Sequence, residues 1–251
     1  MDQTVLAQVG GRDVHLWRTS TSIAPIEASA LEALLSGAER AKAMRFRRPA
    51  DRSRYLASHA MVRLVLSRYV GVPAAELKFE VGDHGKPRLA RNPGSPLSFS
   101  LSHSGDVALL AVSGAPAVGV DIEEIRDDVD VPALAPSVLS AAELGVLHGA
   151  PVGQQRLLFF RSWVRKEAVL KGCGLGLAVN LEQVVVLGRE ASSDGKFTLV
   201  QPGASQTEWG VRDVEIDDRY AAAVAAPGRD WNLRSFEYHQ AAQRQVFLYI
   251  Q

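Results

Sequence analysis

The chain has 251 residues, and its 28 lysines and arginines are balanced by 28 aspartates and glutamates, so the formal net charge is zero. This balance excludes the strong positive field of a typical nucleic-acid-binding protein, and no apolar run approaches the ~20 residues that span a membrane. The length suffices for one large domain or two smaller ones with well-buried cores.

Two further features predict a cytoplasmic protein. Residues 1–4 lack the basic start and apolar run of a signal peptide. Cys173 is the only cysteine, so the chain cannot form an internal disulfide, and this fits a reducing compartment. We interpret Cys173 as structural.

The first part of the chain has the patterns of alternating strands and helices. Ser36 and Glu39 have the spacing of a capping box that opens a helix, and Gly71 and Pro73 stop a second helix. We expect helices at residues 36–48 and 52–70, and strands at 14–17, 77–81, 87–89, 97–101 and 107–112.

After residue 116 the same order of patterns starts again. The later segments 118–123, 140–143, 163–165, 194–196 and 220–225 correspond to 14–19, 36–39, 61–63, 84–86 and 107–112. The repeat length, roughly 100 residues, is a common domain size. We therefore predict an α+β fold of two similar units with mostly antiparallel strands, related by a pseudo-twofold axis. The first unit covers 1–114, the second 115–227, and 228–251 is an appended tail.

The second unit contains a predicted helix, 159–172, that carries charge on its buried face. A single stripe at spacings of three and four contains Phe160, Trp163, Val164, Glu167, Leu170 and Lys171. Because most of this stripe is apolar and should be buried, Glu167 needs a charged partner, a hydrogen-bond network or a metal. The alternative is a simple ion pair between Glu167 and Lys171 at the edge of the stripe.

Asp121 and Glu123 lie two residues apart in a predicted strand, so their side chains point to one face. Two like charges on one face repel each other unless a cation lies between them, and Glu167 can supply a third carboxylate. Oxygen ligands without histidine or cysteine suit Mg²⁺, with Mn²⁺ as a substitute. The alternative is a solvated strand end. The corresponding positions of the first unit hold no acid: Trp17, Thr19 and Val65.

Three groups of residues are candidates for binding phosphate. Gly85-Lys86-Pro87 places a cation in a tight turn. Residues 102–105, with Ser102 and His103, form a predicted loop that offers hydroxyl and N–H groups to an anion. Lys42 is one of several cations of the helix 36–48. Each group has a simpler explanation as exposed surface, but together with the carboxylates they predict a substrate with several phosphates.

Four motifs resemble, in order and spacing, the signatures of the 4′-phosphopantetheinyl transferases. These motifs are residues 85–87, 99–104, 119–123 and 163–171. The resemblance covers about residues 30 to 226 and is to the surfactin-synthetase-activating type, a two-lobed monomer with pseudo-symmetric halves. It implies transfer of 4′-phosphopantetheine from coenzyme A (CoA) to a serine of an apo acyl or peptidyl carrier protein, with release of 3′,5′-ADP.

The resemblance also implies roles for individual residues. Asp121, Glu123 and Glu167 would hold Mg²⁺ against the pyrophosphate, and Lys171 would contact phosphate. The CoA-binding residues would be Lys42 at the 3′-phosphate, Gly85, Lys86 and Pro87 by the adenine, Ser102 and His103 by the 3′-phosphate and pyrophosphate, and Asp121 with Lys171. A basic residue often found three positions before Lys42 is here Glu39, so Arg40 or Arg45 would replace it.

The serine proton needs an acceptor, and Glu167 and Glu143 are the candidates. Glu143 has an alternative role, because it follows Ser140 at capping-box spacing. Two other functions stay open from the residues alone. One is a different Mg²⁺-dependent phosphoryl or nucleotidyl transferase, although the sequence has no glycine-rich phosphate loop of that type. The other is a regulator that binds CoA or a nucleotide without turnover.

Overall fold

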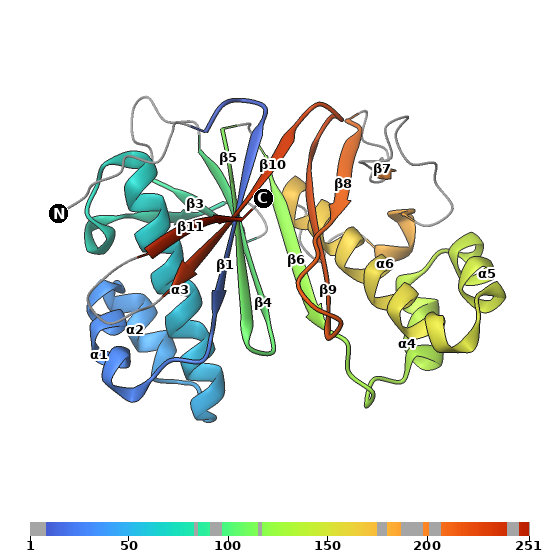
Figure 1. The fold of residues 1–251 in the computed structure, drawn as a ribbon, viewed down its shortest axis with the longest axis horizontal. Coiled ribbons are helices and arrows are strands. Elements are labelled where there is room, and N and C mark those ends of the chain that lie inside the picture. The colour runs from blue at the N-terminus through green and yellow to red at the C-terminus, as the bar shows by residue number, and fades with distance from the viewer. Residues whose placement is uncertain are drawn as a thin grey trace. The chain divides into compact units, whose positions relative to one another are not determined.

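The computed structural model describes residues 9–82, 85–90, 97–114, 117–174, 180–186, 198–200, 207–239 and 246–250 (Figure 1). The chain groups into two compact units. The first comprises residues 1–80, 87–116 and 232–251, and the second comprises 81–86 and 117–231. Within the described ranges, no helix is long and apolar enough to cross a membrane.

The first unit is built on a five-stranded sheet of order β11-β10-β1-β5-β4. Its strands are β1 (Asp13–Ser20), β4 (Ser98–Ser104), β5 (Val107–Ser113), β10 (Asn232–His239) and β11 (Val246–Ile250). Neighbouring strands are antiparallel except β1 and β10, which are parallel. A two-stranded sheet pairs β2 (Phe79–Val81) with β3 (Pro87–Leu89). Residues 228–251, predicted as a tail, thus supply β10 and β11 of the main sheet.

Helices α1 (Pro25–Leu34), α2 (Gly37–Ala43) and α3 (Pro49–Val70) complete the first unit. Helix α3 ends before Gly71 as predicted, because Gly71 adopts the left-handed φ of 69° that terminates many helices. It begins at Pro49, ahead of the predicted start at residue 52, since proline is well suited to the first position of a helix. Met61 and Val65 of α3 pack with Trp17 of β1 and Leu110 of β5 in one apolar cluster. The core of this unit therefore lies between α3 and the sheet.

Some predicted boundaries in the first unit were wrong. The helix predicted at 36–48 ends at Ala43, and residues 44–48 are exposed. Pro49 opens the next helix, and Arg48 directly before it has an extended backbone. The segment 102–105, predicted as a loop, belongs to β4 as far as Ser104. Only Gly105 and Asp106 turn the chain, which the positive φ of Gly105, 54°, allows.

The second unit contains a four-stranded antiparallel sheet of order β6-β9-β8-β7. Its elements are β6 (Gly119–Glu124), β7 (Thr198–Val200), β8 (Trp209–Asp213), β9 (Tyr220–Pro227), α4 (Val131–Val138), α5 (Ala141–Gly149) and α6 (Val152–Cys173). The prediction of mixed helices and mostly antiparallel strands is confirmed in both units. Residues 194–196, predicted to repeat 84–86, lie outside the described residues.

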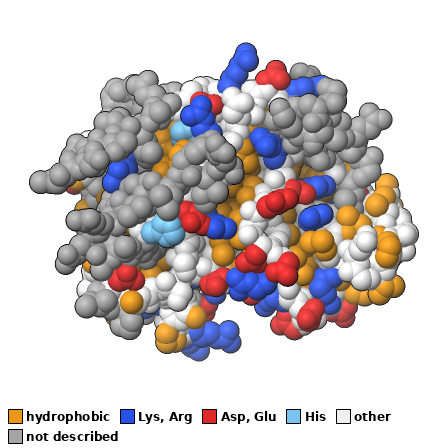
Figure 2. All heavy atoms as spheres, in the orientation of Figure 1, with side chains coloured by type: hydrophobic (Ala, Val, Ile, Leu, Met, Phe, Trp, Pro, Cys, Tyr) orange, Lys and Arg blue, Asp and Glu red, His pale blue; other side chains and the backbone are white. Residues whose placement is uncertain are grey.

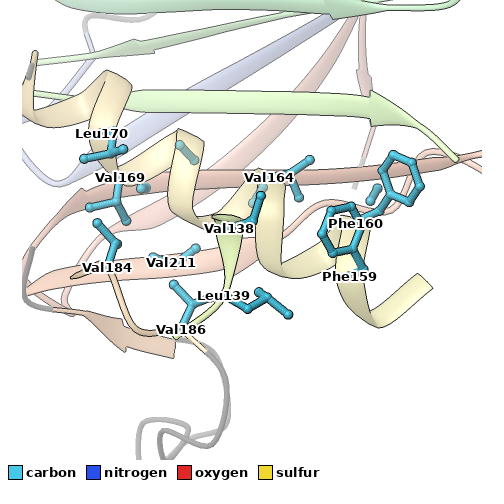
Figure 3. Packing of buried hydrophobic residues seen from close by; sticks show 14 of the residues in the cluster. Val138, Leu139, Phe159, Phe160, Val164, Val169, Leu170, Val184, Val186 and Val211 are labelled. Atoms are coloured by element: carbon cyan, nitrogen blue, oxygen red, sulfur yellow. The ribbon is translucent and has the colours of Figure 1, made fainter. Parts of the chain in front are cut away.

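One face of α6 forms the centre of the second core. Figure 3 shows Phe160, Val164 and Leu170 of this helix together with other apolar side chains of the cluster. The cluster also includes Val184, Val186 and Val211. The predicted stripe of 159–172 is therefore buried along most of its apolar positions, and this burial fixes which side of α6 its charged residues occupy.

The described surface carries charges of both signs. Figure 2 shows lysine and arginine side chains next to aspartate and glutamate side chains, mainly in the lower central part of the face drawn. This intermixing agrees with the zero formal net charge of the sequence.

A buried histidine lies in the first unit, in β1. His15 is 3% exposed, and its Nδ1 is 2.7 Å from the hydroxyl of Tyr69, which also accepts a hydrogen bond of 3.1 Å from Nε1 of Trp17. Burial lowers the pKa of His15; Asp13 opposes this shift and Arg234 adds to it. The native state therefore binds a proton at this site less readily than the unfolded chain does.

Stability should fall with acidification because of His15. Above the ordinary histidine pKa of about 6.5 the ring is neutral in both states, and as the pH falls below it the unfolded chain gains a proton that the native state resists. We expect His15→Gln to flatten the loss of unfolding free energy between pH 7.5 and 5, measured by urea denaturation. His148→Gln, at an exposed position, should keep the parent's slope. Equal slopes in all three proteins would contradict this account.

Candidate active site

Strand β6 and helix α6 come into backbone contact at Gly119. A Cβ atom on this residue would lie 1.8 Å from the carbonyl oxygen of Ala168 and 2.5 Å from the nitrogen of Gly172. Side chains alternate along a strand, so Asp121 and Glu123 point to the same side as Gly119, toward α6. The predicted placement of both carboxylates on one face follows from this geometry.

Asp121 is held by a lysine from α6. Its carboxylate is 2% exposed, and its Oδ1 accepts a hydrogen bond of 2.6 Å from Nζ of Lys171. A buried carboxylate without a counter-charge would cost several kcal/mol. Lys171 therefore supplies a positive charge next to Asp121 that offsets this cost.

Glu167 belongs to the same group of charges. Burial raises the pKa of Glu167, the neighbouring charge of Asp121 raises it further, and Lys171 opposes both. The negative charge of Asp121 therefore acts on Glu167 more strongly than the positive charge of Lys171 does. Lys171 thus acts on two carboxylates: it hydrogen-bonds to Asp121, and its charge also lowers the pKa of Glu167, so the predicted pairing of Glu167 with Lys171 stays open.

The predicted metal ligands do not form a ready-made metal site. Over the part of the chain that the structure describes, no three or more His, Cys, Asp or Glu side chains are grouped closely enough to hold a metal ion. The chemistry of the set nevertheless fits a hard cation, because Asp121, Glu123 and Glu167 offer only oxygen and the first and last repel each other. A metal at this site stays a prediction.

Glu143 is enclosed in the second unit. It is 0% exposed, and its Oε2 accepts hydrogen bonds from the backbone N–H and the hydroxyl of Ser140 and from Nζ of Lys166 at 2.6 Å. Its Oε1 accepts from the N–H of Val186 at 2.6 Å. Of the two roles that the sequence left open, the helix cap is the one that this geometry supports.

The first unit repeats this arrangement with a different cation. Glu39 caps α2 through Ser36 as predicted, and its carboxylate accepts hydrogen bonds of 2.9 and 2.6 Å from the guanidinium of Arg63. These contacts, with His59 and Ser36, hold the pKa of Glu39 well below its usual range against the opposing effect of burial, which is the largest single influence. Glu39 is therefore committed to a structural role.

The buried cations Lys166 and Arg63 were not predicted. Lys166 is 0% exposed and donates to the carbonyls of Val138 and Leu181 as well as to Glu143. A signal was present, since each capping-box glutamate precedes a long helix with a cation at its middle. Sequence periodicity alone does not show that such a cation is buried or which glutamate it pairs with.

The predicted CoA contacts have different environments. Lys42 is exposed, with its Nζ 5.4 Å from the ring centre of Tyr55. His103 is exposed on β4, whereas Ser102 next to it is buried. Gly85 has a φ of 86°, and Lys86 directs its Nζ to two backbone carbonyls, those of Val118 and Gly172, at 3.0 Å each.

Comparison with known proteins decides the family. Residues 17–115 match the family model described as 4′-phosphopantetheinyl transferase, N-terminal, and residues 117–225 match the 4′-phosphopantetheinyl transferase superfamily. The chain is 35% identical over 229 residues to the 4′-phosphopantetheinyl transferase HetI of Nostoc sp., covering 90% of this chain and 92% of HetI. The chain belongs to the 4′-phosphopantetheinyl transferase family.

Other members of the family are similar over most of their length. The 4′-phosphopantetheinyl transferase psf-1 of Bacillus pumilus is 34% identical, with 77% of this chain and 79% of psf-1 covered. The 4′-phosphopantetheinyl transferase of Bacillus subtilis is 28% identical, with 82% and 88% covered. The predicted resemblance to these enzymes is confirmed, and the protein is a transferase.

We predict that Glu143→Gln reduces stability and not chemistry. Loss of the carboxylate charge leaves Lys166 buried without its counter-ion, which costs about 3–5 kcal/mol for such pairs, and Glu143→Gln combined with Lys166→Met should recover part of this loss. Urea denaturation gives the stability, and kcat corrected for the folded fraction gives the chemistry. A fall in kcat of ~100-fold at unchanged stability would instead make Glu143 the general base.

Proposed function

We propose that this transferase moves the 4′-phosphopantetheine group of CoA to a serine of an apo acyl or peptidyl carrier protein and releases 3′,5′-ADP. The observation that supports this proposal most is the group of Asp121, Glu167 and Lys171 on β6 and α6, in a chain whose relatives are phosphopantetheinyl transferases. We propose that it acts as a cytoplasmic monomer.

Asp121, Glu123 and Glu167 would hold Mg²⁺, with Mn²⁺ as a substitute. The donor set contains only oxygen, and the repulsion between Asp121 and Glu167 would be relieved by a divalent cation. The ion would supply charge neutralisation at the pyrophosphate, which is the main need of phosphoryl transfer. Lys171 is a second source of positive charge at the same place and would bind phosphate.

The serine hydroxyl must lose its proton to a base. Glu143 is enclosed and fully hydrogen-bonded, so Glu167 is the candidate that can accept the proton, directly or through a water molecule. Burial and the charge of Asp121 raise the pKa of Glu167, whereas a divalent cation bound to its carboxylate would lower that pKa.

The remaining contacts with CoA are assigned to the first unit and to the turn at Gly85. Lys42 and His103 are exposed, as a phosphate ligand must be. Arg40 donates a hydrogen bond to the carbonyl of Leu35, so Arg45, which is exposed, is the better replacement for the basic residue missing at position 39. In this proposal, residues 1–114 contain the nucleotide contacts, and residues 115–227 contain the metal ligands and the catalytic residues.

We also infer that the two units are copies of one ancestral unit. Helices α3 and α6 both have 22 residues and both end at a glycine with φ of 69°. Each follows a helix opened by a Ser-x-x-Glu capping box, and each donates a buried cation to that glutamate. Alignment of these helices pairs Glu167 with Leu64, one residue from the Val65 expected from sequence.

A direct assay tests the proposed reaction. Protein, CoA, Mg²⁺ and an apo carrier protein should give a carrier whose mass increases by one phosphopantetheine group and whose modified residue is serine. Consumption of a nucleoside triphosphate instead would support the other Mg²⁺-dependent transferases. Binding of CoA without any change in carrier mass would support a regulator.

Asp121→Ala and Glu123→Ala should each lower the rate by more than ~100-fold at saturating CoA, because one divalent ion supplies several kcal/mol of transition-state stabilisation. Initial rates over a range of Mg²⁺ concentrations check this. Asp130→Ala is a control, since the Asp130 carboxylate caps α4 through the N–H of Ala133 and is not a predicted metal ligand, and it should keep the parent's Mg²⁺ dependence. Near-parental activity of either ligand variant at low Mg²⁺ would contradict the metal assignment.

A further inference from the structure

Lys86 is committed to the backbone of the second unit. Its Nζ donates to the carbonyl oxygens of Val118 and Gly172, both at 3.0 Å, and the side chain is half-buried. The N–H of Gly82 donates a 2.8 Å hydrogen bond to the backbone carbonyl of Lys86 and closes the turn that carries this lysine. This environment differs from that of an exposed turn lysine.

The two carbonyls have particular positions in the fold. Gly172 lies in the last turn of α6, where carbonyl groups lack helical partners and carry the negative end of the helix dipole. The ammonium of Lys86 therefore caps this helix. Val118 directly precedes β6, so the same ammonium also holds the start of that strand.

The contacts of Lys86 surround the place where β6 and α6 touch. Gly119 has no room for a side chain against Ala168 and Gly172, and a Cβ on Gly172 would lie 2.3 Å from the ring of Trp209. The backbones of β6 and α6 are therefore in direct contact here, with no space for a side chain between them. Gly172 follows Lys171 directly, and Asp121 is three residues after Val118, so a shift at Lys86 would be transmitted to both partners of the ion pair.

We propose that Lys86 is a positioning residue, whose ammonium holds the start of β6 and the end of α6 so that Asp121, Glu167 and Lys171 meet, and that it does not bind a phosphate of CoA. The inference rests on the proposed function for the identity of the metal and the substrate. It assigns the recognition of CoA at this turn to groups other than the lysine side chain.

The test compares Lys86→Met, which removes the ammonium, with Lys86→Arg, which keeps a charged donor, and with Lys78→Met. Lys78 is an exposed lysine of the preceding segment for which the described residues offer no side-chain partner. Three quantities are measured on the full chain. They are the affinity for Mn²⁺ without CoA by electron paramagnetic resonance, kcat and the KM for CoA in the transfer assay, and the melting temperature in EDTA.

A positioning role predicts a specific pattern. In Lys86→Met, the affinity for Mn²⁺ and kcat should each fall by about 10–100-fold, as for other residues that orient metal ligands. The KM for CoA should stay within about twofold of the parent's value, because the lysine does not contact CoA. Lys86→Arg should recover part of the affinity, and Lys78→Met should match the parent. If Lys86→Met does not fold, Lys86→Arg and Lys86→Gln provide the same comparison.

Two results would overturn the inference. A raised KM for CoA with unchanged kcat and Mn²⁺ affinity would make Lys86 a phosphate ligand, and parental values throughout would show that the lysine has no role. The proposed function fails separately. A parent that transfers no phosphopantetheine, but whose Mn²⁺ affinity depends on Lys86, would leave the positioning role intact. A parent that transfers the group but binds no Mn²⁺ would refute the metal assignment. The role of Lys86 would then be decided by whether Lys86→Met lowers kcat, as for a positioning residue, or raises the KM for CoA, as for a phosphate ligand.

Discussion

The direct contact between β6 and α6 is the constraint on which the candidate active site depends. Because Gly119 has no side chain, the strand approaches the helix until backbone atoms touch, and any larger residue would overlap Ala168. This approach brings a buried aspartate of the strand within hydrogen-bonding distance of a lysine on the helix. With a side chain at 119 the two elements would pack further apart, as ordinary helix–sheet layers do, and short-range pairing of Asp121 with Lys171 would be lost.

The rotation of α6 about its own axis needs a separate determinant. The apolar face of the helix sets it coarsely, since apolar packing is not directional. Lys166 sets it more finely, because its ammonium has three fixed acceptors in a fully buried pocket. Glu167 is the next residue along the helix. Replacing such a buried ion pair by apolar residues is often neutral for stability, whereas removing one partner alone is costly.

Much of this arrangement could be predicted from the sequence because its causes are local. The capping boxes at Ser36 and Ser140, the long helix around Glu167 and the shared face of Asp121 and Glu123 follow from spacings of two, three and four residues. The contact of Lys86 could not be predicted, because its acceptors at Val118 and Gly172 are backbone carbonyls distant in the chain. Backbone groups are present at every residue, so no pattern marks the ones that are used.

The parallel pairing of β10 with β1 places a strand from residues 232–239 beside the first strand of the fold. The first unit therefore lacks part of its sheet until residues 232–250 have left the ribosome, whereas every residue of the second unit has been synthesised by then. The half that begins the chain is thus the half that is completed last. During synthesis, the edge of β1 stays open for the time needed to translate the whole second unit, and the nascent chain must avoid non-native pairing along this edge until β10 arrives.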